Sequence, residues 1–276
     1  VSVTNNLTMG QATLRAGNTA TADINITGTG TLTVGGDIRY TNATLGTENN
    51  TVTLNGGTLD MTNGNIGGVG TVGTANVGTI TFNAQSGTLQ NLAQLNGGGA
   101  SPGATLTKTT GGTLIMRGTN TYTGGTAING GILQANSSGG NSLGTTGNIS
   151  FGGGTLQYTA NDTTDYSARI VNSASAVSID TNGQNVTFTT AMASTNTGGL
   201  TKLGTGTLTF TAVAASAYTG NTAIQAGTLQ LGNGGADGSL NIASAISMDT
   251  TGTFKINQSD TVVQGTDFSG AAITGN

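Results

Sequence analysis

The chain has 276 residues, of which 49 are glycine and one is proline, and glycine, threonine and asparagine together make up almost half of it. It contains no cysteine, histidine or tryptophan, which excludes disulfides, zinc or haem ligation by these side chains, a cysteine nucleophile and a histidine general base. A formal net charge of -4, with only 7 lysine and arginine residues, leaves too little positive charge for a face that binds nucleic acid.

Short segments that alternate threonine with a larger apolar residue recur along the chain, at 31–34, 51–54, 79–82 and 207–210. A period of two is typical of a half-buried β-strand, and the segments between are rich in glycine and asparagine, which favour turns. No stretch shows helical periodicity, and no apolar run approaches the ~18 residues of a membrane-spanning helix. The sequence therefore predicts an all-β fold without a membrane span.

Two copies of a longer pattern are visible when the chain is compared with itself. Segment 106–116 aligns with 200–210, and segment 122–134 aligns with 218–230, with two extra residues in the second copy near 213–215. Within each copy a shorter unit, Gly-Thr-Leu or a close equivalent, returns about every 20 residues or a loose multiple of that. Its apolar positions are Leu32, Leu59, Ile80, Leu114, Leu133, Leu156, Leu208 and Leu229.

A unit of this length cannot bury both faces of its own strands, but stacked units bury a continuous core, as in a solenoid. Glycine and asparagine suit the tight corners, and proline is rare because nearly every backbone N–H is needed between turns. We therefore predict a parallel β-solenoid of roughly 13 coils of ~21 residues, about 60 Å long at the usual strand spacing. Its interior should contain Leu114, Leu133, Leu156, Leu208, Leu229, Ile80 and Phe188.

The first copy reads Gly-Thr-Leu at 112–114, Gly-Thr-Asn-Thr-Tyr-Thr-Gly-Gly-Thr at 118–126 and Gly-Ile-Leu-Gln at 131–134. This pattern of about 30 residues resembles the autotransporter-associated β-strand repeat. The second copy, 206–235, looks like the same repeat. It departs from the first copy by having Ser216 where Asn120 stands and Asn221 where Gly125 stands.

The resemblance is close over 106–135 and 200–235, moderate over 50–105 and 236–268, and weak over 1–30. It implies a right-handed β-helix in a large bacterial protein that is secreted or displayed at the cell surface. Related passengers serve as adhesins and surface stalks, and the repeat carries no catalytic signature in the family.

For the domain organisation, we expect a single continuous solenoid over 1–276. Within it, 106–199 and 200–276 are predicted to be homologous repeat modules, and 1–105 to consist of more divergent coils. The chain opens at Val1 rather than at a methionine, which favours a processed or excised piece of a longer protein.

The densest group of charges is formed by Asp162, Asp165 and Arg169. A polysaccharide lyase or hydrolase built on a β-helix would need carboxylates and a basic residue that converge on one face, and Asp180 could stack on Asp162 from a neighbouring coil. The favoured interpretation is an exposed loop with solvated charges. We therefore predict no catalytic, cofactor-binding or metal-binding residues and no enzymatic activity, with a β-helix polysaccharide lyase or hydrolase as the alternative.

Two further charged features have a structural interpretation. Lys108 and Lys202 occupy equivalent positions of the two copies and are interpreted as solvated charges at strand edges. The segment 234–237 only distantly matches the Gly-Gly-x-Gly-x-Asp calcium loop, so no metal is expected.

An ice-binding solenoid is a minor alternative, because Thr-x-Thr pairs occur at six places along the chain. Their spacing is too uneven for one flat face at constant register, and threonine is a common residue on exposed strands. The pairs are Thr31/Thr33, Thr51/Thr53, Thr79/Thr81, Thr121/Thr123, Thr187/Thr189 and Thr207/Thr209.

The repeats and the lack of clustered chemistry predict a mechanical function: an extracellular or bacterial cell-surface solenoid that acts as stalk, adhesin or filament subunit. Expected partners are further copies of itself and possible glycans or other cells on the lateral face, with no nucleic acid and no cofactor. Neither end carries a charged or helical cap, so the chain is expected to be a segment of a longer array or a subunit that stacks head to tail into a fibre.

Overall fold

The computed structural model describes residues 1–5, 7–9, 19–40, 47–67, 80–96 and 103–275. The chain forms two compact units. The first consists of Val1–Ala127 with Asn136–Gly147, and the second consists of Ile128–Ala135 with Asn148–Asn276.

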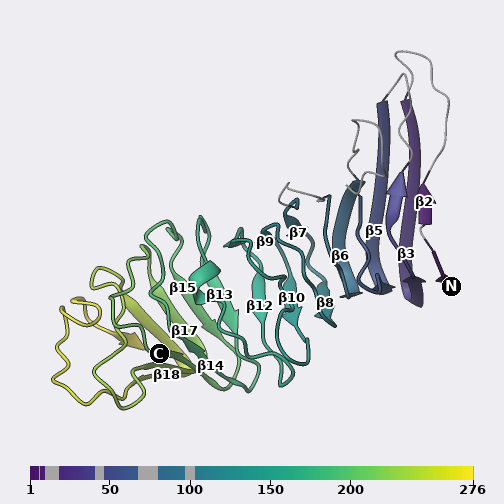
Figure 1. The fold of residues 1–276 in the computed structure, drawn as a ribbon. Helices are drawn as coiled ribbons and strands as arrows, with labels where there is room; N and C mark the ends of the chain where they lie inside the picture. Colours follow the sequence, from purple (N-terminus) through teal and green to yellow (C-terminus); the bar gives the residue numbers. More distant parts are fainter. Residues whose placement is uncertain (6, 10–18, 41–46, 68–79, 97–102, 276) are drawn as a thin grey trace. The chain divides into compact units, whose positions relative to one another are not determined.

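The first unit is built on long parallel strands. β3 pairs with β5, β5 with β6, and β6 with β8, and Figure 1 shows β3, β5 and β6 side by side. β9 (Thr126–Ile128) ends one residue beyond the unit's first segment. The other strands are β1 (Ser2–Val3), β2 (Leu7–Met9), β3 (Thr19–Val34), β4 (Ile38–Tyr40), β5 (Thr47–Asp60), β6 (Ile80–Gln90), β7 (Leu106–Lys108) and β8 (Thr113–Arg117).

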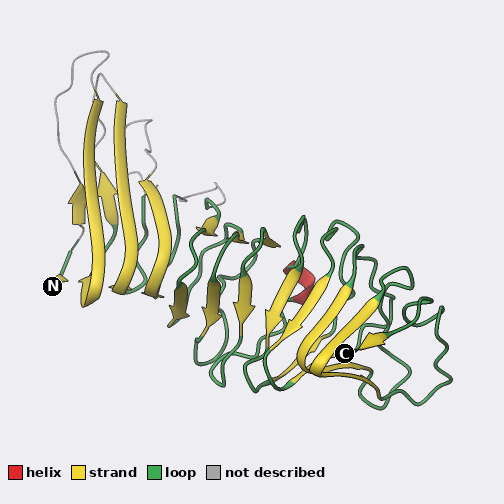
Figure 2. Ribbon diagram, turned by 180° about the vertical axis from the view of Figure 1, so that it is seen from behind, coloured by secondary structure: helices red, strands yellow, loops and turns green. Residues whose placement is uncertain are grey.

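The second unit consists of shorter strands in two parallel ladders. One ladder runs β10–β12–β13–β15–β17–β18, and the other joins β14, β16 and the later part of β17. One 3-residue helical turn, Ser167–Arg169, interrupts the strands (Figure 2). The strands are β10 (Ile132–Ala135), β11 (Ile149–Phe151), β12 (Thr155–Gln157), β13 (Val177–Asp180), β14 (Asn185–Phe188), β15 (Leu200–Leu203), β16 (Thr207–Phe210), β17 (Thr222–Leu231), β18 (Ile246–Ile256) and β19 (Thr274–Gly275).

This architecture confirms the predicted all-β parallel solenoid, but the number of coils is about 9 and not 13. The turns are longer than the Gly-Thr-Leu spacing indicates. Side chains that bond across adjacent turns are 23 residues apart at Gln134 and Gln157, but 30 residues apart at Thr53 and Asn83. The long strands of the first unit lengthen each of its turns. Right-handedness stays a prediction.

The interior is the predicted one. All seven side chains expected to point inward are at most 1% exposed: Leu114, Leu133, Leu156, Leu208, Leu229, Ile80 and Phe188. The strand register stacks them in columns, with Leu133 beside Leu156 and Leu208 beside Leu229 on successive turns. Apolar side chains in such columns exclude water along the stack, and this burial stabilises the fold.

The two extra residues of the second copy form a protruding corner. Val213 is 88% exposed, and Ala214 and Ala215 beside it are exposed as well. Backbone pairing between turns continues on both sides of this corner, since Gly238 N–H donates to Ala212 O and Ala217 N–H donates to Met192 O. The insertion therefore changes the outline of the turn and leaves its register intact.

Candidate functional site

Within the densest group of charges Asp162 is buried, whereas Asp165 and Arg169 are partly exposed, so the interpretation of solvated charges is wrong for Asp162. Its side chain is 1% exposed. Asp162 accepts hydrogen bonds from the hydroxyl of Tyr166 at 2.9 Å and from the backbone N–H of Thr164 at 3.0 Å. These contacts replace the water that an exposed carboxylate would bind.

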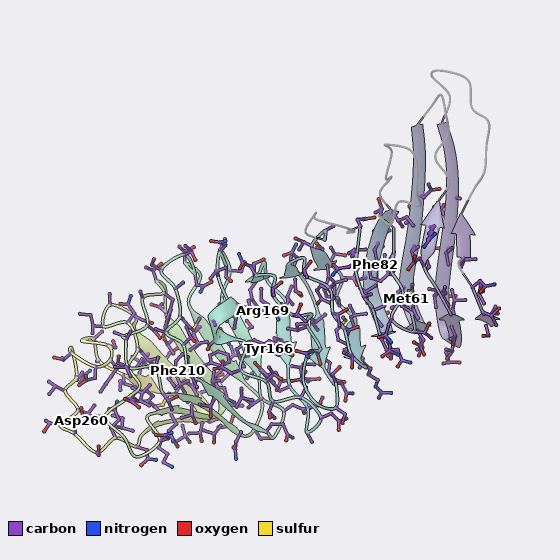
Figure 3. The ribbon with its side chains drawn as sticks, viewed as in Figure 1. Met61, Phe82, Tyr166, Arg169, Phe210 and Asp260 are labelled. Carbon is purple, nitrogen blue, oxygen red and sulfur yellow. The ribbon has the colours of Figure 1, made fainter. Side chains whose placement is uncertain are left out.

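Asp165 and Arg169 also hold the loop in place. Asp165 accepts from the N–H of Ser167 at 2.8 Å, and from the N–H and hydroxyl of Thr189, 24 residues further along, at 2.9 and 2.6 Å. The guanidinium of Arg169 lies 5.8 Å from the centre of the Tyr166 ring, and the two side chains are labelled in Figure 3. A cation over an aromatic ring is attractive at this distance.

Asp180 does not stack on Asp162, as a catalytic pair on neighbouring coils would require. In the strand register Asp180 lies beside Gln157, whose amide donates to Asp180 at 2.7 Å, and Gln134 in turn donates to Gln157 at 2.6 Å. Asp180 also accepts from the N–H of Asn182 at 2.8 Å. Asp180 therefore lies in a different hydrogen-bonding network from Asp162.

Among the described residues, no group of three or more acids forms a potential metal site. A glycosidase needs two carboxylates facing one bond across a defined gap. Asp162 and Asp165 instead direct their oxygens at groups of their own loop and of the neighbouring turn. The arrangement suits the positioning of a loop. That the chain has no catalytic and no cofactor-binding residues stays a prediction.

The interpretation of the two repeat lysines as solvated charges is wrong, because both are fully buried. Lys202 Nζ donates to the carbonyls of Leu203 at 2.8 Å, Gly204 at 2.7 Å and Ala226 at 3.1 Å. Lys108 Nζ donates to the carbonyl of Thr110. Burial lowers the pKa of Lys202 to about 8, against a smaller opposing effect of the Asp180 charge, and also lowers the pKa of Lys108.

A buried tyrosine and threonine form the same pair in both repeats. The hydroxyl of Tyr122 lies 2.9 Å from Thr126 Oγ1, and that of Tyr218 lies 2.5 Å from Thr222 Oγ1. All four side chains are at most 1% exposed. Burial raises the pKa of Tyr218, with a smaller opposing effect from its hydrogen-bonding partners.

The position that differs between the repeats has the same role in both. Asn120 accepts the N–H of Leu92 at 3.0 Å, and Ser216 accepts the N–H of Met192 at 3.2 Å. Both side chains are at most 2% exposed. A short polar side chain is needed here because the N–H of the preceding turn has to be satisfied in the interior.

The polar residues that recur in the repeat therefore face inward and satisfy the solenoid's own backbone. Their recurrence in both copies was the only available signal, and it does not distinguish an internal bond from a ligand contact. Residues available for contact with other molecules lie on the outer faces of the sheets.

In the first unit, outward-facing side chains of β3, β5 and β6 form columns of hydroxyl and amide groups. The register places Asn25 beside Thr53 and Asn83, and Thr27 beside Asn55 and Ser86. Asn83 donates to Thr53 at 3.3 Å, and Ser86 donates to Asn55 at 2.9 Å. The surface is rich in hydrogen-bonding groups. We call these six residues the outer polar columns.

At two positions, Thr53 and Thr209, the threonine does not face another threonine on the next turn. Thr53 lies beside Asn83, and Thr209 lies beside Gln230, so amides alternate with hydroxyls. Thr79 lies outside the described residues. No helix within the described part of the chain has the length and hydrophobicity needed to cross a membrane.

A family model, the passenger-associated-transport repeat, matches residues 106–135 and 200–231. These are the two segments that carry the buried lysine and the Tyr–Thr pair. The resemblance found in the sequence is thus confirmed over both copies.

The chain is also 39% identical over 153 residues to the adhesin BmaC autotransporter of Brucella suis biovar 1 (strain 1330). The match covers 54% of this chain but only 4% of that protein. No solved structure matches the chain.

The matched repeat is a repeat of autotransporter passengers, which are secreted to the bacterial cell surface, and this confirms the predicted extracellular or cell-surface location. The chain thus carries two copies of the passenger-associated-transport repeat, at 106–135 and 200–231, built into a parallel β-solenoid.

Proposed function

We propose that this solenoid is an adhesin-like structural element that holds a contact surface away from the bacterial cell. The observation that carries the proposal is the division between inside and outside. The recurring polar residues, such as Lys202 and Tyr218, satisfy internal groups, while outward positions such as Asn25 and Thr27 are exposed.

Bonds between turns support a stiff element. Asp37 accepts from the N–H and the amide of Asn65 on the next turn at 2.7 and 2.8 Å, and from Arg39 Nη2 at 2.5 Å. Asn196 donates to Ile170 O at 2.9 Å and accepts the N–H of Ser173. Bonds of this kind oppose sliding of one turn over its neighbour, which suits a stalk.

For the contact surface, we infer glycans or surfaces of other cells as partners and the outer polar columns as the binding face. Hydroxyl and amide groups in regular rows can exchange hydrogen bonds with water for hydrogen bonds with a neutral, hydroxyl-rich ligand. The Brucella suis relative is an adhesin, which supports a partner on another cell.

Attachment of coated beads tests the proposal. Beads that carry the 276-residue chain should attach to cultured host cells or to a glycan array more than beads with an unrelated protein. Replacing two exposed residues of the sheet of β3, β5 and β6, Asn25→Arg and Thr81→Arg, should reduce attachment. Thr187→Arg, at an exposed position of β14 in the other unit, is the control. Attachment no better than that of the unrelated protein contradicts the adhesin proposal.

We infer that the chain is not an enzyme. The acids that could act on a polysaccharide, Asp162 and Asp165, are bonded to their own loop and to Thr189. Incubation with pectin, alginate and similar polymers should give no turnover. Cleavage that is abolished by Asp162→Ala or Asp165→Ala would overturn this inference in favour of the β-helix lyase or hydrolase.

End-to-end stacking is a separate proposal, supported by the exposed edge of β18. Among the described residues, β19 pairs with β18 at Ser247 and Met248 alone, and most residues over Thr251–Ile256 are exposed. Such an edge can pair with another strand, either the next turn of a longer array or a second copy. Electron microscopy and sedimentation of the chain at high concentration decide between a fibre and a monomer, and a persistent monomer contradicts stacking of identical subunits.

A further inference from the structure

We propose that the carbonyl groups around Lys202 Nζ form a cation site for a primary alkylammonium group, which the lysine of the repeat fills to fasten two successive turns together. The site is formed by the carbonyls of Leu203, Gly204 and Ala226. The group bound there is the head group of Lys202 itself. The class of ligand that fits the site is therefore an ammonium on a short alkyl chain.

The number and nature of the contacts fit an ammonium. Three carbonyl oxygens accept hydrogen bonds from Lys202 Nζ, at 2.8, 2.7 and 3.1 Å. A lysine ammonium has three N–H donors and no acceptor, so all three are matched. A neutral amine has two N–H groups and a lone pair, which would face one of the carbonyls. The three carbonyl oxygens therefore match the three donors of an ammonium one for one.

The site joins two turns. Leu203 and Gly204 follow Lys202 directly in the chain, whereas Ala226 lies 24 residues further on, in β17 of the next turn. Lys202 itself stands in an inward column, with Ile179 on the turn before it and Ile224 on the turn after it. An aliphatic residue would pack equally well in that column. The presence of a lysine is therefore explained by the hydrogen bonds of its ammonium group.

A glycine keeps the site open. Gly227 has a φ of +67°, and a Cβ atom there would lie 2.9 Å from Lys202 Nζ and 2.5 Å from the carbonyl oxygens of Gly204 and Gly206. Any side chain at Gly227 would thus crowd the site from the next turn. Gly131, which aligns with Gly227 in the first copy, has a φ of +59° as well.

The first repeat has the same lysine in the same local arrangement. Lys108 is fully buried, stands beside the buried Ala84, and donates to the carbonyl of Thr110 two residues further on. This is the counterpart of the bond from Lys202 to Gly204. The part of the arrangement within one turn is therefore present in both repeats.

Chemical rescue tests the site on the full 276-residue chain. Lys202→Ala removes three carbons and the ammonium, so n-propylammonium is the matched probe and 1-propanol is the neutral control of similar size. We expect Lys202→Ala to lower the Tm by at least several degrees and n-propylammonium to restore part of that loss with saturation. Wild type and Lys255→Ala, in which an exposed lysine is removed, should show no such response.

Equal restoration by 1-propanol would mean that only a cavity is refilled and would overturn the proposal, as would a Tm of Lys202→Ala equal to that of wild type. If Lys202→Ala does not fold, the wild type with ¹⁵N-labelled lysine decides. The Nζ–H protons of Lys202 should then exchange with water at least tenfold more slowly than those of Lys255. Equal exchange rates would overturn the proposal.

Discussion

At the scale of single residues, the interior of this protein depends on hydrogen bonds as well as on apolar contacts. Asn120 and Ser216 each accept a backbone N–H of the preceding turn, and Thr222 bonds to both Tyr218 and Ser244. An unsatisfied buried polar group costs about 1–3 kcal/mol. Removal of one partner should therefore lower the free energy of unfolding by more than the small net contribution of the hydrogen bond.

The buried ammonium of Lys202 makes stability depend on pH. Its pKa is lowered by burial from 10.5 to about 8, so between these values the unfolded chain holds more protons than the folded chain. The free energy of unfolding of wild type should therefore rise from pH 8 to pH 10.5 relative to Lys202→Met, by about 3 kcal/mol. Urea unfolding of both proteins at pH 7, 8, 9 and 10 measures this difference, and a constant difference contradicts the prediction.

Removal of a tyrosine hydroxyl should have opposite consequences at two buried positions. Tyr122→Phe leaves the buried hydroxyl of Thr126 without its 2.9 Å partner, and should cost about 1–3 kcal/mol. Tyr158→Phe should be neutral or stabilising, because within the described part of the chain the Tyr158 hydroxyl is buried without a hydrogen-bond partner. Thermal and urea unfolding of both variants gives the comparison, and equal losses would contradict it.

At the scale of strands, the alternation of threonine with apolar residues was sufficient to predict the inward face. Leu208 and Leu229 lie on adjacent turns in register, as the repeat of Gly-Thr-Leu indicated. The sequence does not show how long a turn is, because β3 and β5 have 16 and 14 residues and contain several alternating runs in one strand. The predicted unit of ~21 residues is shorter than the 23 to 30 residues that separate bonded side chains on adjacent turns, which explains the excess of predicted coils.

The positions of the charged side chains could not be predicted for a different reason. A lone lysine on a strand is normally solvated, since burial of a charge is costly without partners. The partners of Lys202 are backbone carbonyls, which are present at every residue and leave no mark in the sequence. The same holds for Asp162, whose partners are a backbone N–H and one tyrosine.

Within a ladder, the central side chain of a column should be the most costly to shorten. Leu156 is fully buried between Leu133 and Ile179 on the turns before and after it. Leu156→Ala should lower the free energy of unfolding by about 2–5 kcal/mol. The exposed Val213 provides the control, since Val213→Ala should change stability by less than about 0.5 kcal/mol. Chemical denaturation measures both variants.

At the scale of the whole molecule, each turn of a solenoid contacts chiefly its neighbours in the stack. In the described residues, β12 pairs with β10 and β13, and β5 pairs with β3 and β6. The stability of such a protein is approximately the sum of the stability of each turn and of the contacts between neighbouring turns. A damaged turn should therefore weaken the turns beside it more than the distant ones.

Hydrogen exchange of Leu156→Ala tests how far a local defect spreads. Amides of β10, β12 and β13 should exchange faster than in wild type, since they belong to the damaged turn and its two neighbours. Amides of β3 and β5, in the other compact unit, should keep their rates. Uniform acceleration over the whole chain would show that the protein opens as one cooperative unit.

The protruding corner at Val213 has a consequence for how such proteins diversify. Strand pairing resumes in register after the two added residues, with β16 still aligned on β17, so added length at this corner leaves the stacked core unchanged. Further residues can therefore be inserted at this corner without disturbing the stacked core of the solenoid. Variants of such a protein can thus differ in the outline of a turn, or carry a new recognition loop on it, while the buried columns keep their packing.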